Sequence, residues 1–369
     1  MNKKKVLHIE NSTHLTGAFK ALLGICEEIK QDYESIVALP QKSECNQLLA
    51  ARDIAWKKLP FYELRKSLKA LLLYLPKLMA NTKRVVQYVK RNHIMIIHAN
   101  DHFNLVAPLA KMLLKKKVKL VVHVRLLPST YNHQLYSLFR HLNTRYADKL
   151  IAVSYAIHKA YRQPPHMLVV RDRIVLKEQR PSFVVRNDAP LKFVYISNYI
   201  QGKGQDLALN AFIKIAAEQQ DCELHFYGGD MGLEKNKFFR ERLEALAKGA
   251  GLYKRVFFHG FVADTESIYK AHDISLCFSE SESFSLICIE SQFYGIPVIA
   301  AASGGPQEII EHEKNGILVA NRNIDEMAAA MKHLLGNFAL RKKLSNEGKL
   351  RAIEIMQATP SFQSVLDQL

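Results

Sequence analysis

The chain has 369 residues, of which 48% are hydrophobic and 24% are charged, and its formal net charge is +17. This length is more than one ordinary core needs and favours two domains of similar size. No run approaches the ~20 apolar residues of a membrane-spanning helix. Residues 1–5 lead into a short strand instead of a signal peptide. The composition therefore argues against an integral membrane protein and predicts a soluble, intracellular one.

The excess positive charge lies in the first half. Residues 1–190 hold 33 Lys and Arg against 13 Asp and Glu, a balance of +20, whereas residues 191–369 hold 19 against 22, a balance of −3. Such asymmetry favours two domains with different partners. The five cysteines are scattered without metal-ligand spacing, which is typical of free thiols in a reducing cytosol.

Short β-rich runs alternate with amphipathic segments along the chain, which is the pattern of parallel sheets built from βαβ units. In the first half we expect helices between strands at residues 6–9, 35–38, 95–98, 119–124 and 149–153. Residues 164–190 contain four prolines and no helical period, so we place the domain boundary at their end.

The second half continues the same alternation. We expect strands at residues 192–196, 223–227, 256–260, 274–278, 298–300 and 317–319, and helices at 206–218, 234–248, 285–294, 324–335 and 339–353. Each half is thus predicted to be a doubly wound α/β domain, the first over residues 1–190 and the second over 191–350. Two such sheets facing each other create a cleft, and ligands bind outside the carboxyl ends of the strands. For the C-terminal segment, 351–369, a return to the first domain is left open.

Two glutamates flank the start of one helix in the second half. Glu282 lies in the loop after the strand at 274–278, and Glu290 lies on the helix about a turn and a half inside it. The backbone N–H groups and the dipole at a helix N-terminus favour a diphosphate. Two carboxylates so placed can accept hydrogen bonds from vicinal hydroxyls, one near a hexose and the other near a ribose.

This segment resembles glycosyltransferase family 4, whose members have two Rossmann-like domains in the arrangement called GT-B. The family hallmark is a pair of glutamates separated by seven residues, then Gly-x-Pro-Val, then Gly-Gly-x-x-Glu. Here these are Glu282 with Glu290, residues 295–298 and residues 304–308. A lone glutamate before a helix is more often a cap, whereas the joint motif favours the sugar-binding role. The resemblance implies a retaining transferase that uses a nucleotide sugar, with UDP-sugars as the first expectation and GDP-mannose as the second.

Further likeness assigns the rest of the donor site. Residues 196–204 resemble the family loop in which an Arg and, five residues later, a Lys contact the diphosphate. Lys203 holds the Lys position, and Asn198 stands where Arg is usual. The resemblance also implies that the Phe261 backbone meets the base. Backbone N–H groups at the helix start are expected to meet the sugar and the phosphates, and they belong to Phe284, Ser285, Leu286 and Ile287.

The first half is more loosely similar to the family. Gly17, after the opening strand, resembles the glycine loop that approaches the diphosphate. Arg125 holds the strand-end position that often carries an active-site His, with His123 two residues earlier. Which of these two serves the acceptor side is left open, and a histidine inside an apolar strand is more often a hydrogen-bonded core residue.

The resemblance also implies a mechanism. Lys203, Arg125 and the helix N-terminus would neutralise the leaving diphosphate, while Glu282 orients the sugar hydroxyls and Glu290 holds the ribose. Glu282, Lys203 and Arg125 are therefore the predicted catalytic residues. Protein cations and amides do this work, and no Asp-x-Asp occurs in the sequence. We therefore expect no metal and no other cofactor.

A stripe of apolar residues in the basic half suggests a membrane partner. Phe61, Leu64, Leu68, Leu71 and Leu75 fall on one face of a helix and are flanked by lysines and arginines. Such a helix lies on anionic lipid, or its stripe packs into the first domain's core, and both alternatives stay open. On the first, the protein is cytoplasmic and peripheral on the inner face of the cytoplasmic membrane. A lipid-linked acceptor, such as a lipopolysaccharide or capsule precursor, would be presented there.

Two other classes of function are open to this composition. A GT-B-like nucleotide-sugar epimerase would share the donor cleft and act without an acceptor. A nucleic-acid-binding protein would suit the net charge. No aromatic-interleaved basic motif or helix-turn-helix pattern supports the latter, however, and the acidic second half would have no role in it.

Overall fold

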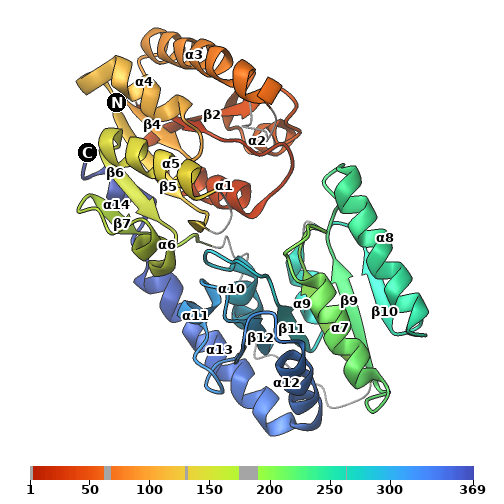
Figure 1. Cartoon of the computed structure of the whole chain (residues 1–369). Coiled ribbons are helices and arrows are strands. Elements are labelled where there is room, and N and C mark those ends of the chain that lie inside the picture. The colour runs from red at the N-terminus through yellow and green to blue at the C-terminus, as the bar shows by residue number, and fades with distance from the viewer. Residues whose placement is uncertain (1–2, 62–67, 129–131, 174–189, 263) are drawn as a thin grey trace. The chain divides into compact units, whose positions relative to one another are not determined.

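The computed structural model describes residues 3–61, 68–128, 132–173, 190–262 and 264–369, with the backbone alone for residues 68–73. The chain divides into two compact units. Unit 1 comprises residues 1–175 and 359–369, and unit 2 comprises residues 176–358. Each unit holds one parallel sheet flanked by helices (Figure 1). Within the described part of the chain, every helix is too short or too polar to span a bilayer.

Unit 1 is built on a seven-stranded sheet in the order β3-β2-β1-β4-β5-β6-β7, and all neighbouring strands are parallel. Its strands are β1 (Lys4–Ile9), β2 (Tyr33–Pro40), β3 (Ala55–Leu59), β4 (Ile96–Ala99), β5 (Lys119–Val124), β6 (Lys149–Ala152) and β7 (Met167–Val169). Its helical segments are α1 (Gly17–Ile29), α2 (Asn46–Ala50), α3 (Leu68–Arg91), α4 (Val106–Leu114), η1 (Lys115–Lys117), α5 (His133–Tyr146) and α6 (Tyr155–Ala160). Five of the strands are at the predicted places. The two edge strands were not predicted, because β3 exposes three of its five residues and β7 has only three.

Unit 2 contains a six-stranded parallel sheet in the order β10-β9-β8-β11-β12-β13. The strands are β8 (Leu191–Ile196), β9 (Cys222–Tyr227), β10 (Val256–His259), β11 (Ile274–Cys277), β12 (Val298–Ala301) and β13 (Ile317–Val319). The helices are α7 (Gln205–Ala216), α8 (Glu234–Gly249), α9 (Thr265–Ala271), α10 (Leu286–Phe293), α11 (Pro306–Ile309), α12 (Ile324–Gly336) and α13 (Phe338–Ala358). All six strands and the five longer helices match the predicted ones.

The order of the strands in unit 2 determines where a ligand can bind. Every residue of β11 and β12 is buried, as expected for strands covered on both faces. The chain starts the sheet at β8, adds β9 and β10 on one side, and then adds β11 to β13 on the other. The loops after β8 and β11 therefore diverge at a topological switch point, which is the usual binding place of open α/β sheets.

The C-terminal helix α14 (Phe362–Leu366) belongs to unit 1, where it lies near β6 and β7 (Figure 1). Tyr33 donates a hydrogen bond to the Asp367 carboxylate (3.2 Å), and Arg173 donates one to the Thr359 carbonyl (2.9 Å). Phe362 is buried and contributes to the core of the unit. Residues 359–369 thus pack as part of unit 1, although the chain reaches them from unit 2.

Three buried histidines form a chain of hydrogen bonds across the sheet of unit 1. The Nδ1 atoms of His8 and His98 lie 2.8 Å apart, and His98 Nε2 lies 2.6 Å from His123 Nδ1. The ring of Phe362 stacks on His123 at 5.6 Å between centroids. Burial lowers the pKa of His8 to about 3 and holds the pKa values of His98 and His123 well below 6.5. All three rings are therefore neutral at physiological pH.

This neutral histidine chain predicts that unit 1 loses stability in acid. Between pH 6.5 and pH 3 the unfolded chain binds protons that folded His8 cannot, so the stability is complete above pH 6.5 and falls below it. We expect the free energy of unfolding to drop by about 1.4 kcal/mol per pH unit for each such histidine. Trp56, the single tryptophan, lies in β3 and reports on unit 1. Urea unfolding followed by its fluorescence should give equal values at pH 8 and 7 and a lower value at pH 5. Equal values at pH 7 and 5 would contradict the prediction.

Candidate functional site

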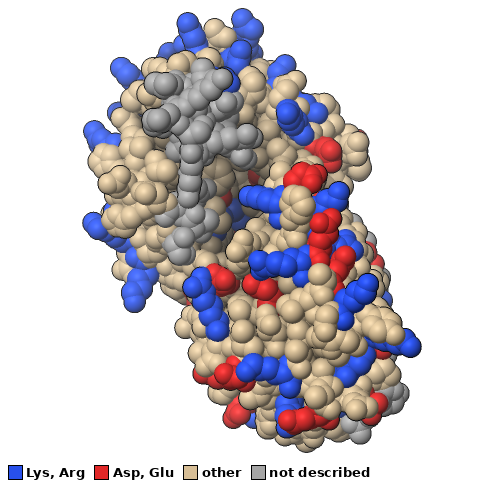
Figure 2. Space-filling view, turned by 45° about the vertical axis from the view of Figure 1, so that its right-hand side comes forward, with Lys and Arg blue, Asp and Glu red and all other residues tan. Residues whose placement is uncertain are grey.

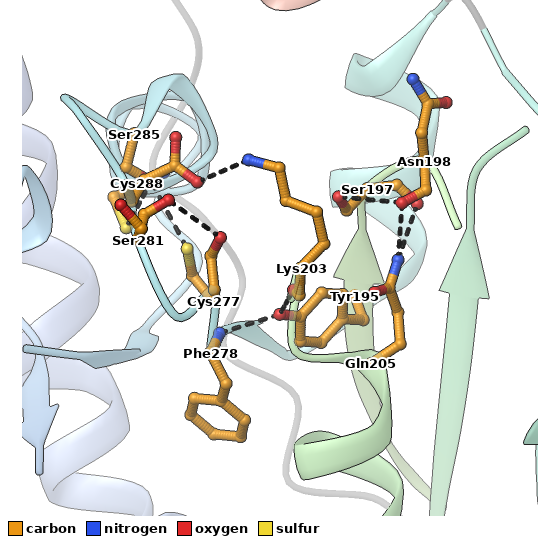
Figure 3. Close-up of polar contacts among 12 residues, drawn as sticks. Tyr195, Ser197, Asn198, Lys203, Gln205, Cys277, Phe278, Ser281, Ser285 and Cys288 are labelled. Carbon is orange, nitrogen blue, oxygen red and sulfur yellow. Dashed lines mark hydrogen bonds and ion pairs between the residues drawn. The ribbon is translucent and has the colours of Figure 1, made fainter. Parts of the chain in front are cut away.

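The loops after β8 and β11 bring Lys203 and Glu282 together. The Lys203 ammonium lies 3.0 Å from the Glu282 carboxylate, and the two side chains are 36% and 22% exposed. The charge of Glu282 is the main cause of a raised pKa at Lys203, so the ammonium stays charged. In Figure 3 the Lys203 side chain extends towards the start of α10, where Ser285 and Cys288 lie. The structure thus joins two predicted catalytic residues in one ion pair within unit 2.

The loop that carries Lys203 needs glycine on both sides of it. Gly202 and Gly204 have φ values of +89° and +82°, which favour glycine. A Cβ atom at Gly204 would also lie 2.1 Å from the Phe278 carbonyl oxygen. The loop is therefore pressed against the segment after β11, which leads on to Glu282.

The backbone of Glu282 is fixed by the loop after β12. Its N–H donates to the Ser303 carbonyl (3.1 Å), and its own carbonyl accepts from the Gly305 N–H (2.6 Å). A Cβ atom at Gly305 would lie 2.3 Å from Phe284 Cα. The close approach that Gly305 permits is therefore to the chain's own backbone. Its effect is to hold the Glu282 segment in place.

The N-cap of helix α10 lies three residues after Glu282 and has a left-handed backbone. Ser285 is the N-cap and has φ +80°, and its hydroxyl accepts from the Cys288 N–H (3.4 Å). The same hydroxyl lies 3.1 Å from the Cys288 sulfur and 3.4 Å from the Cys277 sulfur. The side chains of Phe284 and Ser285 are buried, whereas Leu286 and Ile287 are half-buried. The first N–H groups of a helix have no intrahelical acceptor, so this terminus can serve an anion.

Glu290 lies in the second turn of α10 and is buried, with 6% of its surface exposed. Its carboxylate accepts a hydrogen bond from the Tyr269 hydroxyl (3.4 Å), and Tyr269 is fully buried. The predicted contact of Glu290 with a ribose stays a prediction.

Asn198 connects the ends of neighbouring strands. Its side-chain oxygen accepts from the Gly229 N–H (3.1 Å), and its carbonyl accepts from the Gln205 side chain (2.9 Å). Phe261 is 50% exposed, and its Cβ would lie 3.4 Å from a Cβ added at Gly229. The residues predicted to meet the diphosphate and the base are therefore neighbours. Asn198, however, is uncharged and tied to the backbone of the next loop.

The predicted residues of the first domain lie in unit 1. Gly17 is the first residue of α1, after the N-cap Thr16. Arg125 is buried, donates to the Asn100 carbonyl (2.9 Å) and forms an ion pair with both carboxylate oxygens of Asp172. His123 is the last member of the histidine chain. The charge of Arg125 is thus neutralised within the unit.

Sequence reasoning missed Asp172 and Tyr195. Asp172 follows β7, in the proline-bounded stretch that we assigned to the domain boundary. The sequence does contain a signal for its position: Met-Leu-Val-Val at residues 167–170 is typical of a short strand, and Asp172 comes just after the end of that run. The Tyr195 hydroxyl is hydrogen-bonded to the Lys203 carbonyl and the Phe278 N–H, but the residue lies inside a predicted strand and nothing in its spacing marks it.

Each unit has the parallel α/β fold of a Rossmann-like domain, which confirms the predicted pair of doubly wound domains, and solved structures share this fold. HepE of Anabaena, solved in complex with UDP and glucose, has a TM-score of 0.83 to this chain at 21% identity and covers 99% of this chain and 100% of its own. Sucrose-phosphate synthase of Thermosynechococcus elongatus has a TM-score of 0.77 at 19% identity, covering 99% and 97%.

The family match lies within unit 2. A family model described as "Glycosyl transferases group 1" matches residues 177–351. An uncharacterized glycosyltransferase of Methanocaldococcus jannaschii is 32% identical over 173 residues, which cover 46% of this chain and 42% of that protein. A GDP-mannose-dependent phosphatidylinositol monomannoside mannosyltransferase of Mycobacterium tuberculosis is 30% identical over 152 residues, 38% and 37% of the two chains. The chain thus spans less than half the length of these two relatives.

Proposed function

We propose that this protein is a retaining glycosyltransferase that transfers a sugar from a nucleotide sugar to an acceptor. The observation that carries the proposal is the Lys203–Glu282 pair beside the start of α10, at the switch point of the unit 2 sheet. The pair lies within the segment that matches the glycosyltransferase family model. HepE, the similar structure with UDP and glucose, supports UDP as the first nucleotide to test.

In the proposed mechanism the protein stabilises charge that develops as the diphosphate leaves. Lys203 and the N–H groups at the start of α10 neutralise the diphosphate, while Glu282 accepts hydrogen bonds from the sugar hydroxyls. Glu290 binds the ribose, and the acceptor attacks on the face from which the nucleotide leaves, which retains the anomeric configuration. Arg125 helps to neutralise the diphosphate only if the donor replaces Asp172 as its ion-pair partner. Protein cations and amides supply this stabilisation, so the proposal includes no metal.

A panel of nucleotide sugars tests the proposal. A donor that binds the folded protein raises its melting temperature by mass action, and the transfer itself is read from nucleotide release with and without an acceptor glycan. Conversion of the sugar with the donor alone would instead indicate an epimerase. If no member of the panel binds or reacts, the proposed function is wrong.

The acceptor in this proposal is a cell-surface glycan or a lipid-linked precursor. LpsE of Rhizobium meliloti, a lipopolysaccharide core biosynthesis glycosyltransferase, is 30% identical over 109 residues, 30% of this chain and 32% of that protein. The excess of Lys and Arg in residues 1–190 suits an anionic acceptor or the anionic surface that presents it. Lys and Arg stand around the edge of unit 1 in Figure 2, whereas charges of both signs mix on unit 2.

A lipid-facing patch on unit 1 would place the protein on the inner face of the cytoplasmic membrane. Helices α3 and α4 pack against each other (Figure 1). Leu75 and Met79 on α3 are 64% and 55% exposed, and Met112 and Leu113 on α4 are 40% and 51% exposed. The exposed lysines of η1 follow directly on α4, and residues 102–147 contain no Asp or Glu. Of the predicted stripe, Leu64 lies outside the described residues, as do the side chains of Leu68 and Leu71.

Replacing Lys115, Lys116 and Lys117 together with Gln should weaken binding to anionic vesicles about 100-fold, since each lysine near such a surface contributes about 1 kcal/mol. Sedimentation with phosphatidylglycerol vesicles measures the binding, and phosphatidylcholine vesicles should bind neither protein. Gln at the exposed residues Lys235, Lys237 and Lys248 of unit 2 is the matched control. Equal binding of wild type and the η1 variant, or of both lipids, would contradict the membrane assignment.

A further inference from the structure

A buried tyrosine hydroxyl joins the two loops that carry the ion pair. Tyr195 lies on β8 and is 2% exposed. Its hydroxyl donates a hydrogen bond to the Lys203 carbonyl and accepts one from the Phe278 N–H (2.9 Å). Figure 3 shows the hydroxyl lying between these two backbone segments. The backbone of Lys203 is thus tied to the end of β11, where the chain turns towards Glu282.

The junction has little freedom to rearrange. A Cβ atom at Gly204 would lie 2.8 Å from the Tyr195 hydroxyl, so glycine is what lets the loop come this close. A second link runs from the Glu280 N–H to the Gly202 carbonyl (2.9 Å). Residues 201–204 and 278–282 are therefore joined through hydrogen bonds of their backbones. The side chains of Lys203 and Glu282 add an ion pair between the same two loops.

We propose that Tyr195 is a positioning residue for the donor site, whose hydroxyl fixes the backbone of Lys203 and thereby the place of its ammonium group beside Glu282. This inference rests on the proposed role of Lys203 in binding the donor diphosphate.

A fixed backbone matters for lysine in particular, because its four-carbon stem samples many rotamers. An ammonium that must meet one phosphate oxygen benefits from an anchored starting point. Burial raises the pKa of Tyr195 well above 10, so the hydroxyl keeps its proton and continues to donate over the working pH range. Loss of this hydroxyl would leave the Lys203 carbonyl and the Phe278 N–H without their partner, and the loop would loosen.

A double-mutant cycle separates positioning from a general structural effect. Tyr195→Phe should lower kcat/KM about tenfold in the wild-type background, the size expected for loss of one buried hydrogen bond. In the Lys203→Ala background the same change should cost less than about twofold, because no ammonium is left to position. Tyr33→Phe, which removes a buried tyrosine's hydroxyl in unit 1, is the control and should leave activity unchanged. An equal loss in both backgrounds, or no loss in either, would overturn the proposal.

Chemical labelling tests the same idea without any donor. Mass spectrometry after brief exposure to acetic anhydride gives the acetylation rate of Lys203. This rate should be about threefold or more higher in Tyr195→Phe, because a loosened loop protects its amine less. The rate of Lys332, an exposed lysine of unit 2 paired with Glu218, should be the same in both proteins. If wild type transfers no sugar, the proposed function fails and the labelling still decides the role of Tyr195. An unchanged rate at Lys203 would refute that role.

Discussion

Lys203→Ala should lower turnover by about 100-fold or more. Removal of one positioned donor to charge that develops in a transition state costs roughly 3 kcal/mol of barrier. In unit 2, Asn198 replaces the arginine expected of the loop and is bound to the Gly229 N–H, so it supplies no second cation. The effect should appear in kcat at saturating donor, measured by nucleotide release, more than in KM.

The control for this variant lies in the same unit. Lys332 forms an exposed ion pair with Glu218, which follows the C-terminal end of α7, whereas Lys203 precedes the start of that helix. Lys332→Ala should retain near-normal turnover, because exposed ion pairs contribute about 0–1 kcal/mol to stability. Near-normal turnover of Lys203→Ala with the same donor would mean that the diphosphate binds elsewhere.

The regular part of the fold could be predicted from local patterns. Strands buried on both faces read as short apolar runs, and β11 and β12 are of this kind. The edge strand β3 was not predicted. Most of its residues are exposed, so its sequence, Ala-Trp-Lys-Lys-Leu, has no apolar run that would mark a strand. Its place comes from pairing with β2, which is a tertiary contact and leaves no period in the sequence.

The sequence could nominate residues for the candidate site, but it could not predict their geometry. The family motif placed Lys203 and Glu282 at strand ends, and the strand order brings these ends together. Their ion pair depends on the left-handed backbone of Gly202 and Gly204 and on the Tyr195 hydroxyl. These contacts join residues that are up to 83 positions apart, so no local pattern contains them.

Arg125 illustrates the same limit in unit 1. Its strand-end position gave no sign that Asp172, 47 residues later, would neutralise it. Buried charges are nearly always paired, and the partner is set by which loops the sheet brings together. His123 likewise turned out to be one end of a buried chain, which required three strands to be in register.

Glu282→Gln should separate donor binding from transfer. The Glu282 carboxylate contacts the Lys203 ammonium. A diphosphate that binds this ammonium must compete with the carboxylate and is repelled by its negative charge. Glutamine keeps the shape and removes the charge, so we expect UDP to bind about fivefold to tenfold more tightly. Turnover should nevertheless fall about 100-fold, because a neutral amide holds the sugar hydroxyls more weakly in the transition state.

Opposite changes in affinity and turnover are what make Glu282→Gln informative. Isothermal titration with UDP measures the first, and nucleotide release at saturating donor measures the second. Glu218→Gln, which removes the other carboxylate of the control ion pair, should change neither. If Glu282 does not contact the donor, its neutral variant should leave both quantities near wild type. Weaker binding of UDP would instead show that the carboxylate holds Lys203 in place for the phosphate. The sign of the change in UDP affinity therefore decides whether the ion pair competes with the donor or prepares its site.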